Sequence, residues 1–215
     1  CLAHMSEAGM EQKYVKEAFD SNWVVPMGPN VNAFEADLAK MANSVLDARS
    51  ESGMTLKESL DRKVVCLSAG TAAVHLALIA CGVKTGDEVL VQSFTFCASS
   101  HPITYLGAKP VFIDSERDTW NMDPELLEKA IIERKEVTGK YPKAIIPVAL
   151  YGMPYDCEKI MAIADKYGIP VIEDAAEGMG SRFDGRVLGT FGRFGVLSFN
   201  GNKMITTSGG GALIC

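Results

Sequence analysis

From position 64 onward, two kinds of segment alternate along the chain. Short apolar runs rich in β-branched residues are typical of buried strands, and apolar residues recurring every three or four positions indicate helices. The strands predicted in this way are Val64–Ser68, Glu88–Gln92, Pro110–Ile113, Ala144–Val148, Pro170–Glu173, Phe194–Phe199 and Gly211–Cys215. The helices predicted between the first five strands are Thr71–Cys81, Phe96–Leu106, Pro124–Glu136 and Asp156–Lys166.

This series of strand, helix and strand predicts an α/β fold with a mostly parallel seven-stranded sheet and helices on both faces. Sheets of this kind bind ligands at the carboxyl ends of their strands. The residues that follow each strand are therefore the candidates for a site. Four short stretches in such places are rich in small and functional residues: "SAGTAA", "SFTF", "DAAE" and "NGNK".

The first 63 residues follow a less regular pattern. Helices are predicted over Gly9–Phe19 and Asn32–Met41, with an irregular, proline-containing segment between them. The polar stretch "SVLDARSESGMTLKESLDRK" at 44–63 predicts an exposed insertion that is partly helical. We therefore expect an N-terminal helical part over 1–63, insertion included, and a large domain over 64–215.

Composition narrows the functional classes. The 215 residues are 47% hydrophobic, which suffices for a packed core, and the net charge of −6 argues against nucleic-acid or anionic-membrane binding. The sequence contains no apolar run long enough to span a membrane and no signal peptide pattern. The six cysteines include no CxxC pair and the three histidines have no zinc spacing, so we expect reduced thiols, no metal and a cytoplasmic location.

Lys203 is the one charged residue after Arg193, and it follows an apolar run. A lysine in this setting is either a surface residue at a turn or a group held in a site. Burial or a neighbouring cation lowers the pKa of a lysine amine and makes it a nucleophile toward carbonyl groups.

Three further features follow predicted strands. Gly70 and Thr71 open a helix, where backbone N–H groups can bind an anion; taken alone, the motif more often marks an ordinary strand-to-helix turn with a threonine cap. Asp174, next to Glu173, can cap a helix or pair with a cationic ligand atom. Phe96, which shares a side with Phe94, can pack in the core or stack on a flat ring.

Together these residues provide the groups that bind one cofactor, pyridoxal 5′-phosphate (PLP). Its phosphate would lie at Gly70 and Thr71 with the hydroxyl of Ser198, and its ring would lie against Phe96. Asp174 would pair with the ring nitrogen, and Lys203 would hold the aldehyde carbon covalently.

At these residues the sequence resembles the DegT/StrS sugar aminotransferases, which share the aspartate aminotransferase-like fold of PLP-dependent transferases. The resemblance covers nearly the whole chain except 49–62 and includes the Ser-x-x-x-x-Lys spacing that ends at Lys203. The matching stretches are "NWVVPMGPNVNAFE", "LSAGTAAVHLALIACGV", "GDEVLVQSFTFCASSHPITYLGAKPVFID", "YGMPYDCEKI", "VIEDAAEGMGS" and "GTFGRFGVLSFNGNKMITTSGGG".

The resemblance implies transamination, because members that dehydrate sugars carry histidine in place of Lys203. It implies that Lys203 is the catalytic residue and that Glu177 joins the cofactor site. Glu177 and the "TTSGGG" tail depart from the commonest family residues. Both are similar to the subgroup that aminates UDP-linked 4-keto-6-deoxy-N-acetylhexosamines, with glutamate as amino donor. The substrate-binding residues implied are Asn22, Trp23, Val24 and Val25.

The resemblance also implies a homodimer and a smaller C-terminal domain that this sequence does not include. Two alternatives to an aminotransferase therefore stay open. The chain could be a non-catalytic fragment that keeps the PLP-binding fold, or another PLP enzyme of the same fold type.

Overall fold

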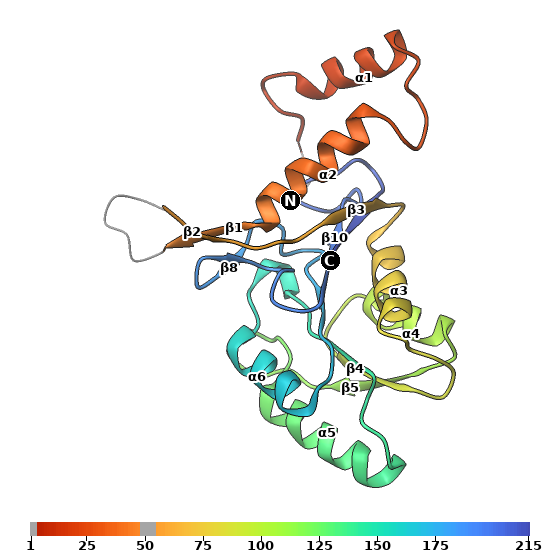
Figure 1. The fold of residues 1–215 in the computed structure, drawn as a ribbon, viewed down its shortest axis with the longest axis vertical. Helices are drawn as coiled ribbons and strands as arrows, with labels where there is room; N and C mark the ends of the chain where they lie inside the picture. Colours follow the sequence, from red (N-terminus) through yellow and green to blue (C-terminus); the bar gives the residue numbers. More distant parts are fainter. Residues whose placement is uncertain (1–3, 48–54) are drawn as a thin grey trace.

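The computed structural model describes residues 4–47 and 55–215. Seven strands form the central sheet in the order β3-β11-β10-β7-β6-β4-β5. Figure 1 shows β3 and β10 toward one end of the sheet and β4 and β5 at the other. Backbone bridges from Ile145 to Val171 and from Val148 to Asp174 join its two halves. The strands are β3 (Val64–Leu67), β4 (Glu88–Gln92), β5 (Lys109–Ile113), β6 (Ala144–Ile146), β7 (Ile172–Asp174), β10 (Phe194–Ser198) and β11 (Gly211–Ile214).

Strand β11 is the antiparallel member of this sheet. It pairs antiparallel with β3 on one side and with β10 on the other, while β10 with β7 and β4 with β5 and β6 pair parallel. The fold class expected from the sequence, a mostly parallel seven-stranded sheet, is therefore confirmed. Each predicted strand lies within two residues of the observed one at both ends.

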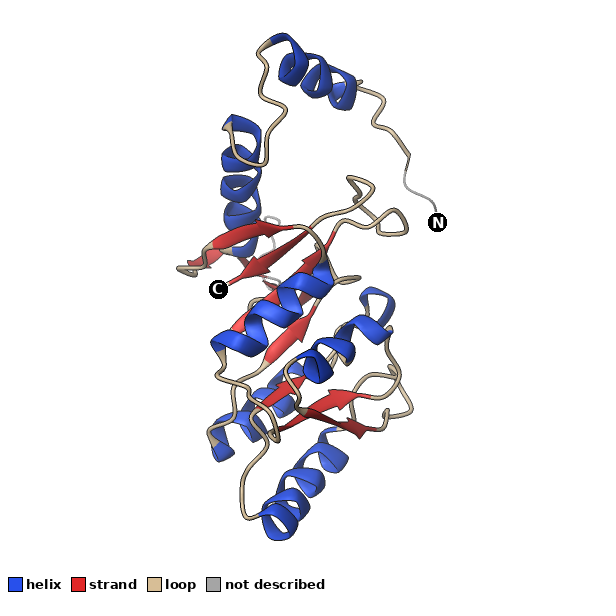
Figure 2. Ribbon diagram, turned by 90° about the vertical axis from the view of Figure 1, so that its right-hand side faces the viewer, coloured by secondary structure: helices blue, strands red, loops and turns tan. Residues whose placement is uncertain are grey.

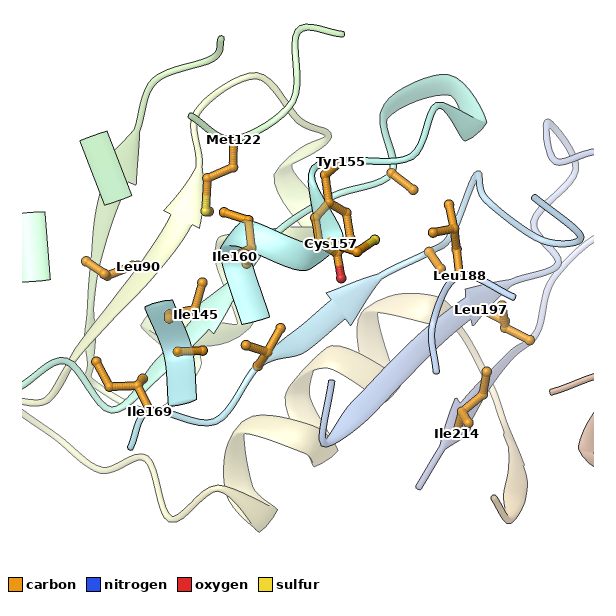
Figure 3. Close-up of a cluster of buried hydrophobic side chains, with 14 of the residues drawn as sticks. Leu90, Met122, Ile145, Tyr155, Cys157, Ile160, Ile169, Leu188, Leu197 and Ile214 are labelled. Atoms are coloured by element: carbon orange, nitrogen blue, oxygen red, sulfur yellow. The ribbon is translucent and has the colours of Figure 1, made fainter. Parts of the chain in front are cut away.

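Helices cover both faces of the sheet (Figure 2). Val89 and Val91 of β4 pack in a core with α3 and α4, whereas Leu90 points to the opposite core with α5 and α6 (Figure 3). This alternation follows from the two-residue period of a strand. The helices are α3 (Gly70–Ala80), α4 (His101–Tyr105), α5 (Pro124–Thr138) and α6 (Cys157–Tyr167). No helix in the described ranges is long and apolar enough to cross a membrane.

The N-terminal part contains α1 (Met10–Asp20) and α2 (Pro29–Ala42). Helix α1 buries no residue and extends away from the sheet, whereas α2 packs on the core through Leu38 and Ala42 (Figure 1).

The partly helical insertion expected after α2 is wrong for the described residues. Strands β1 (Ser44–Asp47) and β2 (Thr55–Ser59) pair antiparallel there, and β1 also pairs with β9 (Arg186–Val187), which pairs with β8 (Arg182–Phe183). The polar composition concealed these strands, and β9, the second partner of β1, lies more than a hundred residues away in the sequence. Residues 48–54 lie outside the described ranges.

The predicted helix Phe96–Leu106 is divided in two. A 3₁₀ turn, η1 (Cys97–Ser99), precedes α4, and Pro102 lies in the first turn of α4. Proline lacks an N–H and is favoured at the start of a helix, so the continuous helix does not form. A second 3₁₀ turn, η2 (Leu150–Gly152), follows β6.

The loop between β10 and β11 contains Ser208 with φ of 71°. Left-handed backbone costs an ordinary residue about 1–2 kcal/mol, and glycine avoids this cost but adds entropy to the unfolded chain. We expect Ser208→Gly to raise the free energy of unfolding by about 0.5–1 kcal/mol in urea titrations. Ser100→Gly, at φ of −102°, is the matched control and should lower it. If the Ser208→Gly chain were no more stable than wild type, the inference that the backbone of Ser208 is strained would be wrong.

Candidate functional site

A cavity of about 310 Å³ lies where the carboxyl ends of β3, β10 and β7 meet. Its volume is within the range of small-molecule sites. All seven residues predicted to bind the cofactor line it: Gly70, Thr71, Phe96, Asp174, Glu177, Ser198 and Lys203.

The start of helix α3 forms one wall of the cavity. Its N-cap residue, Ala69, provides no side-chain cap, so the first N–H groups of the helix are available to an anion. A Cβ atom at Gly70 would lie 3.0 Å from Cβ of Ser198. The absence of a side chain at this position therefore allows the helix start to approach the end of β10 and its hydroxyl group.

Lys203 is held inside the cavity. Its side chain is 13% exposed, and Nζ lies 3.3 Å from Oε1 of Glu177. Oε2 of Glu177 accepts a hydrogen bond of 2.8 Å from the N–H of Tyr151. The lysine is therefore a site residue with a carboxylate partner, and the alternative of a surface lysine at a turn is excluded.

Asp174 and Glu173 point in different directions, which the sequence left open. Glu173 is a buried structural group whose carboxylate accepts the N–H groups of Gly189 and Gly192. Asp174 is also buried but lines the cavity. Burial raises the pKa of Asp174, while a hydrogen bond from Ser99, the N–H of Ala176 and the charge of Lys203 oppose that shift.

The two phenylalanines that share a side differ in role. Phe94 packs edge-on against Trp120, with ring centroids 6.1 Å apart, and does not line the cavity. Phe96 lines the cavity and is 74% exposed. Phe96 therefore has a free ring face on which a flat heterocycle can stack.

The segment Asn22–Val25 lies between α1 and α2 and does not line this cavity. Its large side chains, including Trp23, are more than half exposed. Contact of these four residues with a substrate stays a prediction. Conversely, the sequence interpretation missed Ser99, which is fully buried and bonded to Asp174; the signal was the cluster of hydroxyl residues after β4.

The residues around the cavity fit PLP. A buried carboxylate can face a ring nitrogen, a lysine amine can reach an aldehyde, and a helix start beside a serine can hold a phosphate. Each group comes from a different element, and the sheet brings them together at one end.

The chain matches the DegT/DnrJ/EryC1/StrS aminotransferase family over residues 55–215. It is 51% identical over 98% of its length to "Putative pyridoxal phosphate-dependent aminotransferase EpsN" of Bacillus subtilis (strain 168), covering 49% of that protein. It is 39% identical over 97% of its length to GDP-perosamine synthase of Escherichia coli O157:H7, covering 51% of that protein.

Among solved structures, it is similar to the PLP form of "Putative sugar aminotransferase Spr1654" from Streptococcus pneumoniae. The TM-score is 0.80 at 30% identity, covering 99% of this chain and 51% of the other. The chain therefore spans about half the length of the curated relatives it matches. The match over residues 55–215, together with this fold and cavity, shows that the chain belongs to the DegT/DnrJ/EryC1/StrS aminotransferase family.

Proposed function

We propose that the chain is the cofactor-binding part of a PLP-dependent aminotransferase that acts on a nucleotide-linked keto sugar. The observation that carries the proposal is the meeting of Lys203 and Asp174 in one cavity, beside the uncapped start of α3. Family membership and the printed names of the relatives support the same chemistry.

Bound PLP supplies an aldehyde that combines with amines and a ring that withdraws electrons from the adjacent carbon. The chain's own residues do the rest. The N–H groups of α3 and the hydroxyl of Ser198 bind the phosphate, and Asp174 holds the ring nitrogen protonated. Lys203 moves a proton at the reacting carbon. Glu177 holds the amine of Lys203 in the cavity whenever that amine is not bonded to the cofactor.

We further propose that the sugar is a UDP-linked 4-keto-6-deoxy-N-acetylhexosamine and that glutamate donates the amine. Support for the sugar comes from the stretches "EDAAE" and "TTSGGG", which resemble that subgroup. The relatives named GDP-perosamine synthase make a GDP-linked keto sugar the natural competitor in a test.

Amine transfer from ¹⁵N-glutamate tests this proposal. The chain, PLP and labelled glutamate are incubated with the UDP-linked or the GDP-linked 4-keto sugar, and ¹⁵N in the sugar is followed by mass spectrometry. We expect label in the UDP-linked product at a rate at least about tenfold above the GDP-linked one, since a site built for one set of polar groups discriminates strongly. Faster labelling of the GDP-linked sugar would overturn the nucleotide assignment.

We infer that the working unit is a homodimer in which Asn22, Trp23, Val24 and Val25 contact the sugar nucleotide. Support comes from the family resemblance and from the exposure of this segment, whose side chains are not covered within the chain. Exposed apolar side chains of this extent are typical of surfaces that meet a partner or a ligand.

A further inference from the structure

The five residues from Thr95 to Ser99 contribute to the cavity in two ways. Thr95 and Phe96 line it directly, and the 3₁₀ turn η1 then places Ser99 beneath it. The N–H of Ser99 donates to the carbonyl of Phe96 at 3.1 Å, which closes the turn. The same short segment therefore fixes the exposed aromatic ring and a fully buried hydroxyl group.

The hydroxyl of Ser99 is part of a directed chain of hydrogen bonds. Its Oγ lies 2.6 Å from Oδ2 of Asp174 and 2.8 Å from Oγ1 of Thr95. An ionised carboxylate can only accept, so the single proton of Ser99 points to Asp174. Thr95 must then donate to Ser99. Both hydroxyl groups are thus polarised toward the carboxylate, an arrangement in which each bond strengthens the next.

Ser99 is the one side chain in the described part of the protein that hydrogen-bonds to Asp174. The other bond to this carboxylate comes from the backbone N–H of Ala176, at 3.1 Å to Oδ1. Asp174 is 5% exposed, so water replaces a lost partner poorly. Of the interactions that oppose the rise of the Asp174 pKa on burial, the bond from Ser99 is the largest.

We propose that Ser99, supported by Thr95, is a positioning residue that keeps Asp174 ionised and oriented toward the ring nitrogen of the cofactor. This inference rests on the proposed binding of PLP. It assigns to Ser99 a role exerted through Asp174, without contact between Ser99 and the cofactor.

The test compares two ligands on two proteins. PLP is compared with its analogue in which the ring nitrogen is replaced by C–H, and their dissociation constants are measured for wild type and Ser99→Ala. We expect wild type to prefer PLP, and Ser99→Ala to reduce that preference about tenfold, because a charge-assisted hydrogen bond to the nitrogen's partner is lost. Binding of the analogue itself should change little.

Two further variants make the result specific. Ser100→Ala removes the hydroxyl of the next residue, whose one hydrogen bond within the described ranges goes to the carbonyl of Cys97, and should leave the preference unchanged. Thr95→Val removes the hydroxyl that donates to Ser99 and leaves the bond from Ser99 to Asp174 in place. It should lower the preference for PLP over the analogue by a smaller factor than Ser99→Ala does. It also supplies the test if Ser99→Ala fails to fold.

An equal loss of affinity for both ligands would show that Ser99 only supports the fold, and would overturn the inference. In that case PLP would still form a borohydride-reducible bond to Lys203, so the proposed function would stand. A wild-type chain that binds neither ligand would contradict both proposals.

Discussion

Lys203→Ala is expected to abolish covalent binding of PLP and to lower the rate of amine transfer by at least about 10³-fold. The substitution removes the group that we propose both attacks the aldehyde and moves the proton, and loss of a positioned acid–base group alone costs about 10²–10⁴-fold. Borohydride reduction followed by peptide mass mapping checks the covalent bond. In wild type the reduced adduct should lie on Lys203.

Lys203→Arg separates the charge of the lysine from its nucleophilicity. Arginine retains a cation for Glu177, whose side chain is 29% exposed, but it stays protonated and cannot attack a carbonyl. We expect Lys203→Arg to lose the adduct as completely as the alanine variant while keeping a thermal unfolding midpoint closer to wild type. A reducible adduct at another lysine of the alanine variant would refute the assignment.

Asp174→Asn is expected to weaken PLP binding about 10- to 100-fold, with a larger loss in the rate of amine transfer. The substitution keeps the shape of the side chain but removes the charge that we propose pairs with the protonated ring nitrogen, and a hydrogen bond to a charged group contributes about 1.5–3 kcal/mol. Titration of the PLP absorbance against protein concentration measures the affinity.

The same substitution is expected to stabilise the cofactor-free chain at neutral pH. Burial raises the pKa of Asp174, so the folded state keeps this proton to higher pH than the unfolded chain. The ionised group therefore costs stability as pH rises through its titration. Asparagine carries no such cost and keeps both bonds, since its Oδ1 can accept from Ala176 and its amide can donate to Ser99. Below the unfolded-chain pKa of about 3.8, this electrostatic advantage should vanish.

Glu173→Gln provides a matched control one residue away. Glu173 is equally buried, but its carboxylate bonds to the loop at Gly189 and Gly192 and not to the cavity. We expect this variant to leave the affinity for PLP within about twofold of wild type. If Asp174→Asn weakened PLP binding no more than Glu173→Gln, the pairing of Asp174 with the ring nitrogen would be wrong.

The sheet could be predicted from the sequence because its strands are apolar on both faces. Buried parallel strands appear as continuous β-branched runs, and four of the strands, β3, β4, β5 and β6, are each followed by a helix that packs on the sheet. Strands β1 and β9 have neither property. They are short, and besides their local partners β2 and β8 they pair with each other across about 140 residues, which no local pattern records.

The sequence predicted those residues of the candidate site that end a strand or directly follow one. Gly70, Asp174, Ser198 and Lys203 follow β3, β7 and β10 or end them, and the structure brings them to one cavity. Ser99 was missed because its role depends on the end of β4 lying near the end of β7. Neither sequence neighbours nor residue type alone distinguish it from Ser100.

The position of β11 has a consequence for how the protein is made. Strand β11 inserts between β3, the first strand of the sheet, and β10, so among the described strands β3 has no partner until residues 211–214 are available. During synthesis on the ribosome, the edge of β3 therefore stays unpaired while roughly 150 residues are added, which takes about 10–30 s. Non-local pairing of this kind slows folding. The start of α3 and Ser198, which we propose to bind the phosphate, thus meet only once residues 211–214 have joined the sheet, and the nascent chain cannot hold its cofactor in this way before that point.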